Sequence, residues 1–172
     1  MVNDTGGDAG MDKQEPLRRR VNWRRILRWT AGSLVAVLLA IQLVPYGRDH
    51  SNPAITEAVV WDTPRTGELV QQSCNDCHSN ETKWPWYSNI APISWLVQHD
   101  VDEGRQKLNF SEWDQPGQEV DESVETIREG EMPIWYYTIT HRDASLSETE
   151  KQELIDGFLA TFGSGSTQER GD

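Results

Sequence analysis

The stretch "SCNDCH", residues 73–78, contains both cysteines of the 172-residue chain, Cys74 and Cys77, and one of its four histidines, His78. Two cysteines separated by two residues occur in redox disulfides, in zinc sites and, when a histidine follows directly, at sites of covalent haem attachment. These three chemistries make different demands on the rest of the chain, which can therefore be used to choose among them.

The first two alternatives find little support in the remaining sequence. A redox C-x-x-C pair usually starts a helix in a βαβ unit, and no segment shows the alternating pattern of a strand. A zinc site needs four ligands, whereas the chain has no third cysteine, and His50, His99 and His141 show no ligand spacing. Covalent haem uses both cysteines as thioethers and the adjacent histidine as an iron ligand. We therefore expect one haem c per chain, held by Cys74, Cys77 and His78.

Charge is distributed unevenly along the chain. Residues 1–28 carry a net charge of +3 and include six arginines, whereas residues 29–172 carry −15. Binding to nucleic acid phosphates requires clustered lysines and arginines, so the acidic part argues against a nucleic-acid partner. It suits a soluble domain whose surface attracts a cationic protein, here a redox partner that the sequence does not identify.

A run of uncharged residues, "WTAGSLVAVLLAIQLV", extends from Trp29 to Val44. As a helix it would measure about 24 Å, which spans a ~30 Å hydrocarbon core only if flanking apolar residues contribute. No A-x-A cleavage signal follows it, so we expect an uncleaved signal anchor rather than a cleaved signal peptide. The preceding arginines predict a cytoplasmic N-terminus in a single-pass inner-membrane protein, with the remaining chain on the periplasmic or extracellular side.

The predicted fold class is mostly α, with four helices after the linker. The helices are expected over residues 64–73, 92–108, 121–129 and 147–162. Thr63 and Pro64 are typical of a helix start, "SETE" forms a capping box at Ser147, and Gly130 is a stop signal. About 100 residues make a small core, which a prosthetic group would enlarge.

These features predict the following organisation: residues 1–25 cytoplasmic, first disordered and then basic; 26–44 a transmembrane signal anchor; 45–63 a linker; 64–163 a c-type haem-binding domain; 164–172 a disordered tail.

A second iron ligand is needed if the haem is six-coordinate. Met132 is favoured, because Pro133 directs it into an extended conformation from which its thioether can reach across a ring, although a methionine can also simply fill a core. His99 points away from the apolar stripe of its predicted helix, His141 follows a predicted loop, and His50 lies in the linker. A methionine ligand would favour Fe(II) and would leave no open coordination site, which suits electron transfer.

Two aromatic clusters flank the expected ligands. They are predicted either to wall the macrocycle and exclude water or to pack as ordinary core. The clusters are "KWPWYS", with Trp84, Trp86 and Tyr87, and "IWYY", with Trp135, Tyr136 and Tyr137.

Three stretches, "CNDCHSNETKWPWYSNIAPISWLV", "LNFSEW" and "GEMPIWYY", resemble the bacterial haem-binding domain family, whose members are small exported or membrane-anchored proteins with a CxxCH block. The similarity covers about residues 45–162 and implies covalent haem binding at Cys74, Cys77 and His78. The order of helix, CxxCH, Met-Pro loop and C-terminal helix also resembles class I cytochromes c, although "WPWYS" departs from their pattern. The expected fold is thus a small cytochrome c-like helical haem domain preceded by one transmembrane helix.

The expected function is one-electron transfer outside the cytoplasmic membrane, rather than enzymatic catalysis. Two alternatives stay open at this point. One is a haem-based enzyme or gas or redox sensor with a labile distal ligand, and the other is a structural thiol domain without haem.

Overall fold

The computed structural model describes residues 22–163, so the predicted tail 164–172 and nearly all of the predicted cytoplasmic segment lie outside the described residues. Within this range the secondary structure is helical, apart from one isolated parallel bridge between Glu57 and Glu112. The mostly α fold class is therefore confirmed. The chain divides near Leu39 into two units, which are described separately.

The first unit contains all but the last turn of helix α1, Trp23–Ile41. Its bounds differ from the predicted span, because the helix starts three residues earlier and takes in Arg24 and Arg25 as well as Arg28. Over the part of the chain that the structure describes, no helix is both long and apolar enough to cross a membrane. This finding contradicts the prediction of a transmembrane helix over residues 26–44.

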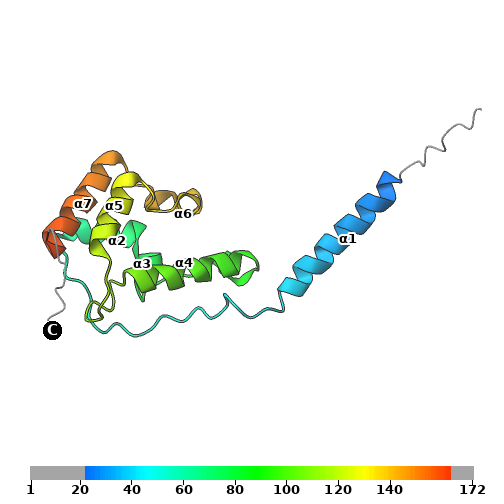
Figure 1. Ribbon diagram of the computed structural model, residues 1–172, viewed down its shortest axis with the longest axis horizontal. Helices are drawn as coiled ribbons and strands as arrows, with labels where there is room; N and C mark the ends of the chain where they lie inside the picture. Colours follow the sequence, from blue (N-terminus) through cyan, green and yellow to red (C-terminus); the bar gives the residue numbers. More distant parts are fainter. Residues whose placement is uncertain (1–21, 164–172) are drawn as a thin grey trace, which may run out of the picture. The chain divides into compact units, whose positions relative to one another are not determined.

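The second unit is a helical body (Figure 1). Its helices are α2 Pro64–Ser73, α3 Asn75–His78, α4 Ile93–Lys107, α5 Val120–Glu129, α6 Trp135–Thr140 and α7 Glu148–Phe162, with short 3-10 turns at η1 Trp86–Asn89 and η2 Arg142–Ala144. Each of the four predicted helices is present, with ends within one residue of those expected, so these predictions are confirmed.

Local capping explains where two helices of the core, α2 and α7, begin. The Thr63 hydroxyl accepts a hydrogen bond from the Thr66 backbone N–H at 3.2 Å, with Pro64 at the first helical position of α2. At α7 the predicted capping box forms, because Ser147 and Glu150 satisfy each other's backbone N–H groups. At the end of α5, Gly130 adopts φ 79°, the left-handed conformation that glycine tolerates.

The core lies where α7 packs against α2 and α5, and Figure 1 shows these three helices gathered at one end of the body. Leu69, Leu154 and Phe158 are at most 1% exposed and form its centre. A Cβ on Gly157 would lie 2.4 Å from the Thr66 hydroxyl oxygen, so α7 and α2 approach closely only because this position has no side chain.

Two segments behave differently from a simple connector. Residues 45–63, the predicted linker, run extended along the body, where the Val59 N–H donates to the Phe110 carbonyl and Trp61 stacks on Phe158 with ring centroids 5.6 Å apart. Residues 135–140, predicted as loop, form α6, and that prediction is wrong. The hydroxyls of Tyr136 and Tyr137 hold this short helix to carboxylates of distant segments.

Candidate functional site: a cavity around the CxxCH turn

The "SCNDCH" stretch joins α2 to α3. Cys74 ends the first helix and caps the second, and its carbonyl accepts from the backbone N–H groups of Cys77 and His78 at 3.1 and 2.9 Å. The two thiols are therefore one helical turn apart, and the histidine follows immediately. α3 packs against α4, where a Cβ on Gly104 would lie 2.6 Å from the Cys77 carbonyl oxygen. Glycine at this position allows α4 to approach the turn closely.

His78 is oriented by a backbone hydrogen bond. Its Nδ1 lies 3.1 Å from the Leu108 carbonyl oxygen, and because a carbonyl only accepts, Nδ1 carries the proton. The other ring nitrogen, Nε2, is then the unprotonated one, with a lone pair for a metal ion. Burial lowers the pKa of His78 below its ordinary value, which favours this neutral form.

Both cysteines are free thiols in the structure. Burial raises the pKa of each thiol to about 12, with Cys77 adding to the shift at Cys74, and Asp100 and Asp76 adding to that at Cys77. Thiols with raised pKa values are in the protonated form at neutral pH. Within residues 22–163, no group of three or more His, Cys, Asp or Glu side chains is arranged to hold a metal ion.

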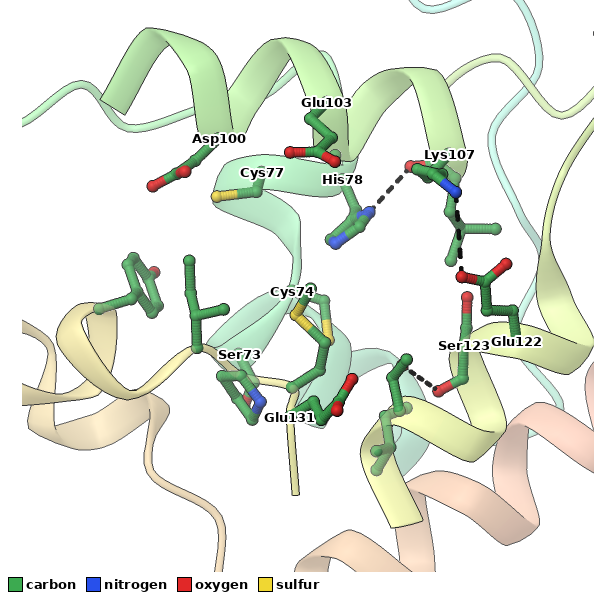
Figure 2. Close-up of a pocket in the computed structure, with 18 of the residues that line it drawn as sticks. Ser73, Cys74, Cys77, His78, Asp100, Glu103, Lys107, Glu122, Ser123 and Glu131 are labelled. Atoms are coloured by element: carbon green, nitrogen blue, oxygen red, sulfur yellow. Dashed lines mark hydrogen bonds and ion pairs between the residues drawn. The ribbon is translucent and has the colours of Figure 1, made fainter. Parts of the chain in front are cut away.

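The two thiols and the imidazole face a cavity of about 360 Å³, within the range of ligand sites in proteins. Figure 2 shows Cys74, Cys77 and His78 around one space, with Asp100, Glu103 and Lys107 of α4 on one side and Glu122 and Ser123 of α5 on another. The interior is apolar, formed by Leu108, Phe110, Ile127, Ile134, Leu154 and Phe158. Its polar rim includes the Lys107–Glu119 ion pair at 2.9 Å.

Met132 lines the same cavity and packs, half-buried, against the hydrophobic core. Its backbone N–H donates to the Thr126 carbonyl of α5 at 3.2 Å, which fixes the loop after Gly130 over the cavity. A thioether, an imidazole and two thiols therefore share one mainly apolar space.

One buried polar atom in this lining has no protein partner. The Ser73 hydroxyl is buried and makes no hydrogen bond in the described structure. An orphaned hydroxyl on the wall of a cavity is expected where a bound group supplies the missing contact. Together with the soft sulfur and nitrogen donors, it fits a bound haem better than an ordinary apolar core.

The other candidate histidines lie outside this cavity. His99 is exposed and sits 3.4 Å from Glu103. His50 stacks on Trp84 at 4.6 Å and contacts the Ser88 carbonyl through Nε2. His141 stacks on Tyr137 at 4.1 Å and lines a second, smaller cavity.

The residues of the two predicted aromatic clusters fall into three groups. Trp84, Trp86 and Trp135 line neither cavity, and the last two are 76% and 71% exposed. Tyr87 lines the second cavity. Tyr136 and Tyr137 line both cavities.

Sequence reasoning did not find the groups that position these tyrosines or the histidine. Tyr136 donates to both Asp100 oxygens at 3.1 Å, Tyr137 donates to Asp76 at 2.8 Å, and His78 donates to the Leu108 carbonyl. In each of these hydrogen bonds the donor and the acceptor are 30 to 61 residues apart along the chain, so no local sequence pattern predicts them.

An apolar cavity that offers one neutral imidazole nitrogen and sulfur atoms suits a large apolar group with a metal at its centre, which is the chemistry of a haem-binding domain. Comparison with protein families agrees, because the model of the haem-binding domain family matches residues 36–160, and the chain belongs to this family. No curated protein and no solved structure matches the chain.

Proposed function

We propose that the chain binds haem covalently, as a c-type haem, and serves in one-electron transfer. Cys74 and Cys77 would form the thioethers, His78 would be the proximal iron ligand, and Met132 the distal one. The observation that carries this proposal is that all four side chains line one cavity, with Nε2 of the histidine free to ligate.

Bound haem would supply an iron that exchanges one electron reversibly between Fe(II) and Fe(III). The chain's own residues determine how that site behaves. The Leu108 carbonyl fixes the ring orientation and tautomer of His78, and it raises the basicity of the ligating nitrogen. A thioether from Met132 would favour Fe(II), and the apolar lining would keep water from the bound haem. A filled sixth position suits electron transfer better than substrate binding at iron.

Replacement of Met132 by alanine tests the distal assignment. In the haem-loaded chain, Met132→Ala is expected to convert low-spin ferric iron to high-spin and to open the ferrous form to carbon monoxide. His99→Ala is the matched control, because His99 is an exposed candidate ligand outside the cavity, and its spectrum should equal that of the parent chain. An unchanged spectrum in Met132→Ala would remove Met132 from the site. A parent protein that already binds carbon monoxide readily would favour a haem enzyme or sensor instead of an electron carrier.

We propose further that the haem-carrying body is exported from the cytoplasm, a proposal that rests on sequence. Six arginines precede the uncharged run from Trp29 to Val44, which is the order of an export signal. Protease added to intact spheroplasts should degrade the body. Protection until the cells are lysed would place it in the cytoplasm.

A further inference from the structure

A second cavity lies beside the CxxCH turn, and its lining contains neither of the proposed iron ligands. Its volume is about 190 Å³, and neither Cys74, His78 nor Met132 lines it. It shares Cys77, Asp100 and the α6 tyrosines with the first cavity, so the two spaces adjoin. We propose that this second cavity binds a small neutral aromatic alcohol, a phenol or hydroquinone, whose hydroxyl donates to Asp100.

The walls of the second cavity favour a flat apolar ring. α4 contributes Ile93, Leu96, Val97 and Val101, and the loop before η1 contributes Pro85. On the α6 side, Tyr137 and His141 stack with an interplanar angle of 21°, which gives an aromatic surface. Ile93 and Leu96, two large apolar side chains of α4, stay 46% and 45% exposed. A ligand that covers them removes apolar surface from water, which is favourable in proportion to the area buried.

The size of the space limits the ligand. A volume of about 190 Å³ is below the ~300–1,000 Å³ typical of sites for drug-sized molecules. One substituted ring fits such a space, whereas a second haem or a peptide segment does not.

The polar groups that line the second cavity favour a ligand that carries a hydrogen-bond donor. Asp100 accepts from the Tyr136 hydroxyl, but a carboxylate has about four acceptor positions, and no ion pair among the described residues involves it. His141 Nδ1 lies 3.2 Å from the Tyr137 carbonyl, which only accepts, and 3.1 Å from the Thr140 hydroxyl, which itself donates to that carbonyl. Nδ1 therefore carries the proton, and Nε2 is an acceptor as well. Asp76 is different, because it already accepts from the Tyr137 hydroxyl and the Lys83 backbone N–H.

The charged residues that line the second cavity favour a neutral ligand over an anionic one. Two carboxylates, Asp76 and Asp100, line the cavity, against one exposed lysine, Lys83. An anion placed there would meet like charge in a partly desolvated space, which is costly. A neutral hydroxyl gains a hydrogen bond to a charged acceptor, one of the stronger kinds.

Equilibrium dialysis of the haem-loaded full chain against para-cresol tests the proposal. Saturable binding of one molecule is expected. The analogue para-methylanisole, which has the same ring but no donor, should bind ~10-fold or more weakly, and Asp100→Asn should weaken para-cresol by a similar factor. The para-toluate anion should not compete.

Two variants locate the site. Val97→Phe fills the cavity from α4, and Leu96→Trp closes its exposed mouth, where a larger side chain does not threaten folding. Both should abolish saturable para-cresol binding while the haem spectrum stays unchanged, because neither residue lines the first cavity. Ile139→Phe, a matched substitution on the exposed face of α6 outside either cavity, should leave binding intact.

Equal binding by Leu96→Trp and the parent chain would overturn the proposal, as would equal affinity for cresol and the anisole. Failure of the parent chain to bind para-cresol at all would do the same. None of these outcomes depends on the haem being covalent or on Met132 being its ligand, so the dialysis and the function proposed above fail separately.

Discussion

The Gly104→Ala substitution tests whether close contact between α4 and the CxxCH turn builds the site. The added Cβ would lie 2.6 Å from the Cys77 carbonyl oxygen, 3.0 Å from its carbon and 3.1 Å from the Cys77 Cβ. Ordinary contacts begin at 3.4 Å, so α3 and α4 must separate by 3.4 − 2.6 = 0.8 Å. Two of the opposing atoms are backbone, which cannot turn aside as the end of a flexible side chain can.

Two effects of opposite sign then compete. Overpacking costs about 1–3 kcal/mol, and rigid backbone contact places this site near the upper end. Alanine gains ~1 kcal/mol over glycine inside a helix. We expect the free energy of unfolding to fall by about 2 kcal/mol, measured by urea denaturation. His78 should also lose its alignment, because α4 leads directly to the Leu108 carbonyl that orients it. The haem spectrum of the folded fraction should therefore change.

The control for this substitution is Gly32→Ala in α1. Gly32 also lies inside a helix, but a Cβ there meets nothing within 4 Å. It should leave the unfolding of the body and the haem spectrum unchanged. If Gly104→Ala is as stable as the parent chain and keeps its spectrum, the close approach of the two helices does not position the site, and the reasoning is refuted.

Two further predictions concern the core and pH. Leu69→Ala, at a side chain that is 0% exposed, should lower the free energy of unfolding by ~2–5 kcal/mol in urea, whereas Leu43→Ala, at 84% exposure, should change it by less than about 0.5 kcal/mol. Similar losses for both would contradict the assigned core. Hydrogen bonds from Ser147 lower the pKa of Glu150 below its ordinary 4.5. A carboxyl with a lowered pKa stabilises the fold above its unfolded pKa, and that stability is lost as pH falls through the folded value. The Tm difference between the parent chain and Glu150→Gln should therefore be constant above about pH 5 and shrink below 4.5; a pH-independent difference would contradict this cause.

Much of the fold could be predicted from sequence because its main helices carry local signals. Thr63 and Pro64 start α2, the Ser147 capping box starts α7, and Gly130 ends α5. Each signal acts within one turn of the residue that carries it, so no knowledge of the tertiary structure is required.

α6 and the second cavity could not be predicted in this way. "WYYTIT" is composed of aromatic and β-branched residues, which have weak helix propensity. The helix is held instead by hydrogen bonds from Tyr136 to Asp100 and from Tyr137 to Asp76, which depend on the tertiary fold. The exposure of Ile93 and Leu96 could not be predicted from sequence either. The helical period of α4 predicts which side chains share a face, but whether another element packs against that face depends on the tertiary fold.

The position of Met132 could be predicted from sequence only in part. The Met-Pro sequence predicted a loop that could present the thioether, but only the fold brings that loop over the cavity that the CxxCH turn lines. The bond from the Met132 N–H to the Thr126 carbonyl, which fixes the loop, joins backbone groups and has no signature in the residue types.

The mass of the denatured chain, after maturation with a c-type haem system and acid extraction of loosely bound haem, tests the central claim most directly. We predict an increase equal to one haem in the parent chain and none in the Cys74→Ala, Cys77→Ala double variant. A parent chain that returns to its polypeptide mass with all colour in the extract would show that haem is bound without thioethers, and would contradict the claim that "SCNDCH" is an attachment site.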